Sequence, residues 1–286
     1  MVELTQQLLN GLVIGSFYVL IAMGLSIIYG ILEIPHFAHG SVAVIGGYFS
    51  YILTSQYNLH LLLSIVISMI FAALVGILLE RIAYRPVKNA PPINAFIIAL
   101  GLMMVIDNGL TIIFSPDQII IPSEYNQVYS FLGVSITNLR LYLLFSSILL
   151  ILFLYLFINR TKTGKAIRAV AQNREASTIV GINTNRITSI VFGLGSALAA
   201  SAGVFMGVLF SLYPTMGGHS VMKGFAVIIL GGLGSFPGTI IGGMLIGITE
   251  SLGSSIFSSS YKDIFAFLIM ITILMFKPQG LFGSKG

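Results

Sequence analysis

Charged residues are scarce in this sequence, and cysteine is absent from it. Only 8% of the 286 residues are charged, whereas about 25% are charged in an ordinary globular chain. Hydrophobic residues make up 56%, and the mean hydropathy is +1.00, so the apolar surplus extends along the chain. Because a soluble core of this size could not bury so much apolar surface beneath a charged exterior, the composition excludes an ordinary soluble fold. It predicts an all-α, polytopic membrane protein.

The missing residues also exclude several kinds of site. Without cysteine there is neither a disulfide nor a thiolate metal site, and the four histidines show no HExxH spacing, so we expect no metal and no cofactor. No GxxxxGK[ST] phosphate loop is present, so the chain cannot itself supply nucleotide hydrolysis. The formal charge of +5 is expected to reflect Lys and Arg in the cytoplasmic loops of a membrane protein. The expected partner is therefore lipid rather than nucleic acid.

Apolar runs of membrane-spanning length recur along the chain. A span needs about 17–25 mostly apolar residues. Such runs are predicted at residues 8–30, 38–57, 61–80, 93–114, 141–158, 187–212, 224–252 and 263–276. The first is expected to be a retained span, because no Lys or Arg precedes Arg81 and a signal peptide needs a basic start. The run 224–252 is too long for one helix and is interrupted by Gly231–Gly238, so we expect two arms there and about eight or nine spans in all, some discontinuous.

Two clusters of basic residues predict the orientation. One lies at residues 81–88 and the other at residues 160–186, and together they hold nine of the fourteen basic residues. Because Lys and Arg accumulate in cytoplasmic loops, both clusters should face the cytoplasm, and the loop from about Ser115 to Arg140 should face outward. The N-terminus is then expected outside the cell and the C-terminus in the cytoplasm.

The segment from Thr161 to Asn185 is the most informative part outside the spans. Residues 164–176 predict an amphipathic helix, with Ile167, Val170 and Ala171 on its apolar stripe. A glycine stop at Gly181 and a second short helix would complete a compact knob below the membrane. Such a knob either fits a groove on a partner protein or lies on anionic lipid, and the residues alone leave both interpretations open.

Several motifs carry a resemblance to a known family. Glu175, Ala176, Ser177 and Gly181 fit the first half of the EAA loop of ABC importer permeases, although its Ile-x-Leu-Pro ending is absent. Phe37–Gly40, Gly231–Gly238 and Lys277–Gly283 resemble three further motifs in the same order. The chain therefore resembles the branched-chain amino acid permease family (the LivH/LivM type), and most of all its LivH-type subunit.

The resemblance implies a non-catalytic permease subunit in the prokaryotic plasma (inner) membrane. The chain would be a single transmembrane permease domain over residues 1–286, with a coupling loop at about residues 159–186. Its implied partners are a second homologous permease subunit, two cytoplasmic ABC ATPase subunits and an extracytoplasmic solute-binding protein. The implied substrates are branched-chain or other small amino acids, while some relatives carry urea or amides. The residues expected to couple to the ATPases are Gly164, Lys165, Arg168, Arg174, Glu175, Ala176 and Gly181.

Polar groups at membrane depth are costly, so they are candidates for the translocation path. Broken helices are candidates too, because their free backbone groups must line a cavity or be buried in protein. The candidate path residues are His36, Phe37, His39, Gly40, Asp107, Asn108, Gly231, Gly232, Gly234, Ser235 and Pro237. His219, Lys223 and Glu250 flank the second break. Each has a purely structural alternative, such as capping a helix or bonding a carbonyl.

Two other functions remain open at this point. The broken helices and membrane acids also fit a self-sufficient secondary transporter or channel for a small polar solute. A membrane enzyme that uses Asp107 or His39 ranks lowest, because no paired acid and base or metal spacing accompanies them.

Overall fold

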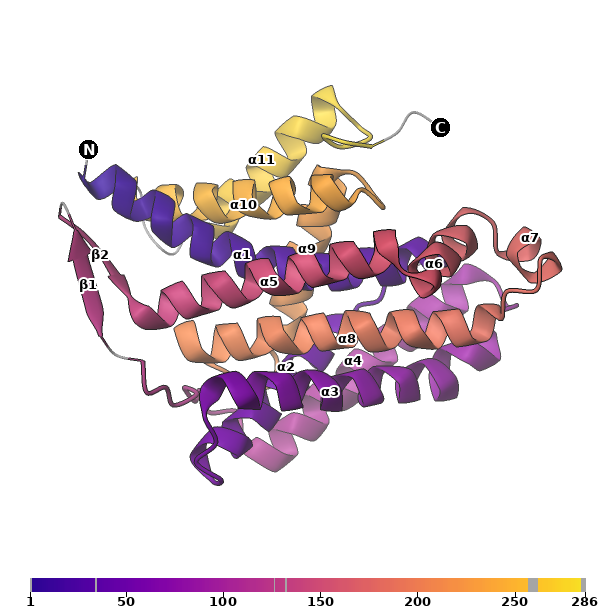
Figure 1. The fold of residues 1–286 in the computed structure, drawn as a ribbon, viewed down its shortest axis with the longest axis horizontal. Coiled ribbons are helices and arrows are strands. Elements are labelled where there is room, and N and C mark those ends of the chain that lie inside the picture. The colour runs from indigo at the N-terminus through magenta and orange to yellow at the C-terminus, as the bar shows by residue number, and fades with distance from the viewer. Residues whose placement is uncertain (1, 34, 126, 132, 257–261, 284–286) are drawn as a thin grey trace.

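The computed structural model describes residues 2–33, 35–125, 127–131, 133–256 and 262–283. Most of this chain forms long helices that run side by side (Figure 1). The long helices are α1 (Val2–Leu32), α2 (Ala38–Ser55), α3 (Leu61–Leu79), α4 (Pro92–Phe114), α5 (Asn138–Arg160), α8 (Thr184–Leu209), α9 (Met216–Gly231), α10 (Phe236–Ile256) and α11 (Lys262–Phe276). Helix α3 continues through a π-helical turn, Glu80–Tyr84, and a 3-10 turn, Arg85–Val87.

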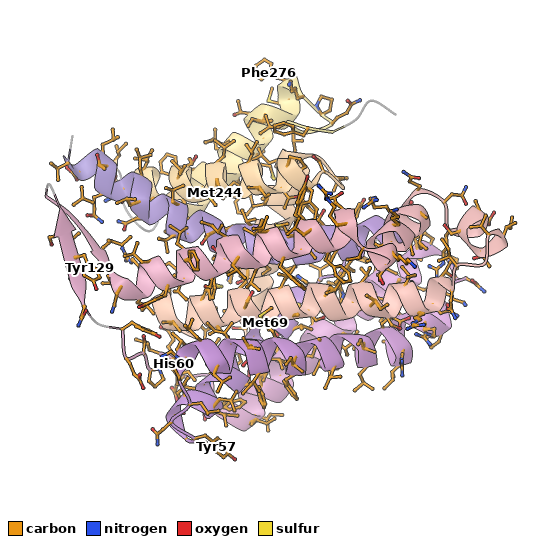
Figure 2. The ribbon with its side chains drawn as sticks, in the orientation of Figure 1. Tyr57, His60, Met69, Tyr129, Met244 and Phe276 are labelled. Carbon is orange, nitrogen blue, oxygen red and sulfur yellow. The ribbon has the colours of Figure 1, made fainter. Side chains whose placement is uncertain are left out.

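The helical, multi-pass membrane fold agrees with the composition. Six of the described helices are long and apolar enough to cross a bilayer, namely α1, α3 with its extension, α4, α5, α8 and α10. Helix α9 and residues 267–276 of α11 are apolar but shorter. Apolar side chains such as Phe276, which is 82% exposed, point away from the bundle (Figure 2), as expected where lipid or another membrane subunit is the neighbour.

A short β-hairpin departs from the all-α prediction. Strands β1 (Val128–Phe131) and β2 (Val134–Thr137) pair antiparallel, with Tyr129 opposite Ile136. The hairpin lies beside the N-terminus of α1 (Figure 1), and the Gln6 side chain bonds both the N–H and the carbonyl of Ser135, at 2.8 and 2.9 Å. The loop at about 115–140 and the N-terminus therefore share one end of the bundle.

Helix α1 is the centre of the bundle. Residues 19–22 are fully buried, and α10, α8, α9 and α5 all pack against α1. A helix that is buried all round needs no amphipathic stripe, and its sequence is apolar on every face. Small residues permit close packing of α1 on α10: a Cβ at Gly11 would lie 2.6 Å from the Cα of Ile248, so glycine is required there.

Helix α2 begins deep inside the bundle rather than at its end. After α1, the chain turns back through Glu33, whose φ is +55°. The Nε2 atom of His39, in the first turn of α2, donates to the carbonyl of Ile21 at 3.2 Å. Ile21 lies eleven residues, or about 16 Å, before the end of α1 at Leu32. The predicted break near Pro35 is therefore a real re-entry into the bundle.

Helix α9 begins at the same depth, where the prediction was wrong. A span was expected to start at residue 224, but α9 starts at Met216. Gly217 packs directly on Gly40, since a Cβ at Gly217 would lie 2.6 Å from the carbonyl carbon of Gly40. Glycine has a low helix propensity, yet the close packing against α2 outweighs it at Gly217. The two arms expected on either side of Gly231–Gly238 are present as α9 and α10.

Candidate functional site

A cavity of about 560 Å³ lies beside the start of α9. Its lining residues come from the turn before α2 and from α4, α9 and α11: Phe37, Leu100, Met103, Asp107, Thr215, Gly218, His219, Met222, Lys223 and Phe267. The volume falls within the range of about 300–1,000 Å³ that is usual for small-molecule sites. Most of the lining is apolar, with two charged side chains at fixed positions.

Asp107 supplies the negative charge in this cavity. It is partly buried, and the Ser41 hydroxyl donates to its Oδ1 at 2.6 Å, which joins α2 to α4. Its neighbour Asn108 is exposed and donates to the Met104 carbonyl of its own helix at 2.7 Å. Of these two candidate path residues, Asp107 lines the cavity and Asn108 does not.

Lys223 supplies the positive charge and belongs to a buried cluster. Its Nζ lies 2.9 Å from Oε1 of Glu250 on α10 and donates to the Tyr18 hydroxyl of α1 at 2.7 Å. The Tyr18 hydroxyl in turn donates to Oε2 of Glu250 at 2.6 Å. Buried charges of this kind require partners and good geometry, which this cluster provides. A Lys and a Glu in otherwise apolar arms were the sequence signal, but their pairing across 27 positions was not apparent from the sequence.

The two candidate histidines are buried away from the cavity. His36 places Nδ1 2.6 Å from the Tyr84 hydroxyl, and its ring centroid lies 5.4 Å from that of Phe192. His39 bonds the Ile21 carbonyl as described above. These contacts hold the re-entrant turn against α1, α3 and α8. Between these histidines Phe37 lines the cavity, and Gly40 forms the crossing with α9.

The Gly-rich candidates form the turn between α9 and α10, apart from the cavity lining. Gly232 and Gly234 have φ of +100° and +77°, and the Ser235 hydroxyl accepts from the Gly238 N–H at 3.2 Å. Pro237 sits in the first turn of α10, where proline is tolerated. The C-terminal segment pairs with this turn, because Phe282 donates its N–H to the Gly231 carbonyl at 3.0 Å. Two motifs of the sequence thus meet in one backbone structure.

The coupling segment contains two short helices, but the helix predicted over residues 164–176 is divided at Asn173, before the expected stop at Gly181. Helix α6 (Lys162–Gln172) ends where Asn173 becomes extended, and the Asn173 side chain accepts from the Ala176 N–H at 2.8 Å to cap α7 (Arg174–Ile179). The stripe residues Ile167 and Val170 are buried, as predicted, but Ala171 is exposed, because it lies in the last turn of α6 before the chain bends away. Gly181 has a φ of +86° and ends α7, which fits its predicted role as a stop.

Some of the remaining coupling candidates pack against the protein, and others are exposed. Gly164 fits tightly against the carbonyls of Phe157 and Ile158 at the corner between α5 and α6. Arg168 donates to the Ile158 carbonyl, so it caps the end of α5. Arg174 lines a small cavity near Glu80, whereas Lys165, Glu175 and Ala176 are exposed. Next to them, Ile179 and Val180 are 86% and 75% exposed, which the sequence did not single out.

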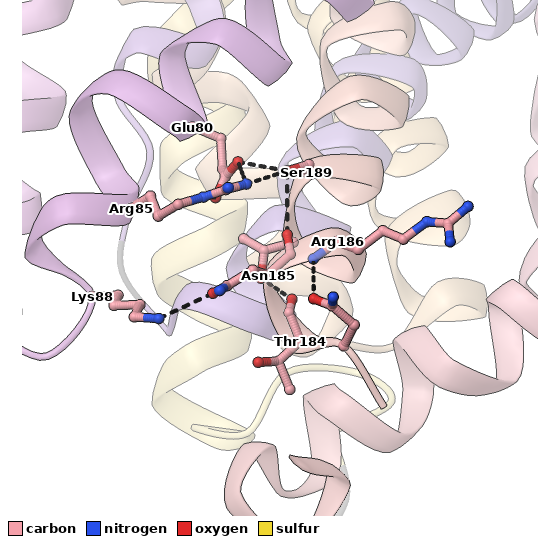
Figure 3. A network of polar contacts seen from close by, with 9 residues as sticks. Glu80, Arg85, Lys88, Thr184, Asn185, Arg186 and Ser189 are labelled. Carbon is pink, nitrogen blue, oxygen red and sulfur yellow. Dashed lines mark hydrogen bonds and ion pairs between the residues drawn. The ribbon is translucent and has the colours of Figure 1, made fainter. Parts of the chain in front are cut away.

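A polar network that the sequence did not reveal joins the end of α3 to the start of α8 (Figure 3). Glu80 is 2% exposed, and Arg85 and Ser189 both donate to its Oε2, each at 2.7 Å. Nearby, Lys88 donates to Oδ1 of Asn185 at 3.1 Å. The two basic clusters of the sequence therefore lie at the same end of the bundle. An acid at the end of the apolar run 61–80 was the available signal for this network.

Comparison with known proteins identifies close relatives. The profile of a family described as "Branched-chain amino acid transport system / permease component" matches residues 7–274. The chain is 34% identical to the high-affinity branched-chain amino acid transport system permease protein LivH of Escherichia coli (strain K12), over 97% of this chain and 95% of that protein. Identity to the corresponding permease protein BraD of Pseudomonas aeruginosa is 35%, with the same coverage of both chains. A probable LivH of Methanocaldococcus jannaschii is 30% identical, over 97% of this chain and 92% of that protein. No solved structure matches the chain.

Proposed function

This chain belongs to the family of branched-chain amino acid transport permeases, and we propose that it forms one half of the translocation pore of an ATP-driven importer. The cavity where α2 and α9 begin is the observation that carries this proposal. Helices that start in mid-membrane leave backbone groups that need a polar cavity or protein partners, and transporters place substrate at such points. The proposed cargo is a branched-chain or other small amino acid.

A second, homologous permease is proposed to complete the pore. Helix α4 forms one wall of the cavity and buries only 11% of its most apolar stretch within this chain. Its large apolar side chains that are exposed are Ile93, Ile97, Met104, Val105, Ile112 and Ile113. Such a surface needs lipid or another apolar helix as its neighbour. The complex would lie in the prokaryotic inner membrane, with about eight or nine crossings per chain, the N-terminus outside and the C-terminus in the cytoplasm.

Separate ATPase subunits are proposed to dock at α6 and α7, since this chain has no phosphate loop. Ile179 and Val180 project as an exposed apolar tip at the end of α7. An apolar tip between basic residues suits a groove on a protein, where it would be buried on docking. The Glu80–Arg85–Ser189 network would carry a displacement of this region from α8 to α3.

The test of the importer assignment is reconstitution in vesicles with the second permease, both ATPases and the binding protein. Amino acid uptake should require ATP and the binding protein, and should stop when the ATPases are replaced by hydrolysis-deficient variants. Uptake that survives without hydrolysis would refute the proposal in favour of a secondary transporter or channel.

The coupling tip has its own test with a matched control. I179D places a carboxylate in the proposed protein contact and should lower both ATPase association and uptake by about tenfold or more, since desolvating a charge without a partner is unfavourable. I179L keeps the apolar tip and should retain both. If I179D assembles and transports as well as I179L, the tip does not bind the ATPases.

A further inference from the structure

Helix α3 ends in a π-helical turn, Glu80–Tyr84, instead of continuing as an α-helix. The Arg85 N–H bonds the carbonyl of Glu80, five residues earlier, and the two side chains form the ion pair drawn in Figure 3. Residues five apart lie about 140° apart around an α-helix, so α-helical geometry would turn these side chains away from each other. Isolated π turns are rare, and they are often found at functional sites. The last residue of this turn, Tyr84, is therefore a candidate for a functional role.

Tyr84 joins the π turn to the re-entrant segment before α2. Its hydroxyl lies 2.6 Å from Nδ1 of His36, and both side chains are almost fully buried. The other ring nitrogen of His36, Nε2, has no hydrogen-bond partner in the described part of the chain. The place of the His36 ring therefore depends on the Tyr84 hydroxyl and on packing against Phe192 of α8, whose ring centroid lies 5.4 Å from that of His36.

Tyr84 also borders the small cavity at the end of the bundle that carries the coupling segment. Arg174 of α7 and Asn185 of α8 line the same cavity. The Ser189 hydroxyl of α8 donates to Oε2 of Glu80, the first residue of the π turn, at 2.7 Å. A shift of α8 relative to α3 would act on the π turn through this bond, and Tyr84 would move with the turn.

Phe37, the neighbour of His36, forms part of the wall of the 560 Å³ cavity. Its ring lies between α4 and α9, with centroid distances of 5.7 Å to Phe96 and 5.1 Å to Phe225. His36 and Phe37 belong to the short segment between α1 and α2. Because a rigid peptide unit keeps neighbouring Cα atoms about 3.8 Å apart, a displacement of His36 would also displace Phe37.

We propose that Tyr84 is a positioning residue that couples the ATPase-docking segment to the translocation cavity. Its hydrogen bond to His36 transmits a displacement of the π turn to Phe37, which changes the width of the cavity between α4 and α9. This inference rests on the importer function proposed above. Tyr84 and His36 have no contact with the solute in this scheme, since neither lines the cavity.

The first test compares the ratio of leucine uptake to binding-protein-stimulated ATP hydrolysis in the complete reconstituted transporter. Y84F removes only the hydroxyl and should lower uptake per ATP hydrolysed by about fivefold or more, because His36 loses its partner. Y48F is the matched control, since the Tyr48 hydroxyl is buried without a partner among the described residues, and it should leave the ratio unchanged. H36N should keep most of the ratio, because its amide lies near the position of Nδ1 and can bond a hydroxyl as donor or acceptor.

A double variant separates coupling from stability. Y84F and H36L each leave a buried polar group without a partner and should lower thermal stability, whereas Y84F/H36L removes both groups and should recover most of it. Uptake per ATP should stay low in the double variant, because the link is still missing. Recovery of this ratio together with stability would show that the bond only stabilises the fold. A wild-type ratio in Y84F would also overturn the inference, whereas a wild-type transporter without ATP-driven uptake would overturn the importer function itself.

The absence of cysteine permits a second test that does not depend on transport. F37C gives this chain a single thiol in the cavity wall, and a methanethiosulfonate reagent should modify it at different rates without nucleotide and with ATP bound to hydrolysis-deficient ATPases. Y84F/F37C should lose this difference, and Y48F/F37C should retain it. If F37C is modified at the same rate in both states, or if Y84F leaves the difference intact, the inference is wrong.

Discussion

The crossing of α2 and α9 at Gly40 and Gly217 offers a quantitative test of the structure. An alanine Cβ at position 217 would lie 2.6 Å from the Gly40 carbonyl carbon and 2.7 Å from the Ser41 nitrogen. Ordinary van der Waals contact begins at 3.4 Å, so the helices would have to part by about 0.8 Å. Both partners are backbone atoms in buried helices, which cannot yield as a side-chain end can.

We therefore expect G217A to destabilise the protein by about 1–2 kcal/mol. Overpacking a buried contact costs about 1–3 kcal/mol, and the gain in helix propensity from Gly to Ala offsets up to about 1 kcal/mol of it. G218A is the matched control, because a Cβ there meets nothing within 4 Å in the same turn of α9. It should leave stability unchanged or raise it.

The measurement is thermal inactivation in detergent, followed by size-exclusion chromatography of the soluble fraction. G217A should lose its monodisperse peak at a temperature several degrees below that of G218A and wild type. Equal stability of G217A and G218A would refute the close crossing, and with it the argument that α9 enters the bundle at the depth of α2.

Two further predictions concern the end of the bundle that carries α6 and α7. E80Q should lower the free energy of unfolding by about 1–3 kcal/mol, because it removes the charge that accepts hydrogen bonds from Arg85 and Ser189. K88Q, at the exposed bond to Asn185, is the control and should change it by no more than about 0.5 kcal/mol. Equal effects of the two variants in thermal inactivation would show that the Glu80 network is not stabilising. G232A should destabilise the protein more than G234A, although both positions have positive φ. A Cβ at position 232 would lie 2.5 Å from the Gly283 nitrogen, whereas a Cβ at position 234 would meet nothing within 4 Å. Equal thermal stability of the two variants in the same assay would contradict this.

Composition and motif could predict the membrane fold and the family because these properties need no knowledge of contacts. The scarcity of charged residues indicates that the chain lies in a lipid bilayer. The basic residues at 81–88 and 160–186 mark loops that lie at the same end of the helical bundle. Asp107 was predicted as a path candidate from the cost of a charge in a span, and it lines the cavity. Membrane segments can be predicted in this way because every helix that faces lipid needs apolar side chains and internally satisfied backbone hydrogen bonds.

The rest of the site depends on contacts between distant segments. His36 and His39 are polar and lie at a break, so the sequence could not distinguish them from cavity residues, yet their partners Tyr84 and Ile21 bury them elsewhere. His219 and Met222 line the cavity because α9 starts at Met216, and nothing in its glycine-rich start predicts a helix. Asn173, by contrast, carried a usable signal, since Asn is a favoured helix cap.

The position of the cavity follows from how the two re-entrant helices are built. In each half of the chain a long helix, α1 or α8, is followed by a turn back and a shorter helix, α2 or α9, that begins in mid-bundle. The first-turn N–H groups of a helix have no partners within it, and lipid supplies none. These turns therefore need either buried bonds to protein carbonyls, such as that from the His39 N–H to the His36 carbonyl at 3.1 Å, or a cavity that admits polar groups. The close crossing at Gly40 and Gly217 brings the N-termini of α2 and α9 together. The cavity therefore borders the first turns of α9, and Asp107, which accepts a hydrogen bond from Ser41 of α2, lines the same cavity. Separation of that crossing by G217A should then alter solute passage as well as stability.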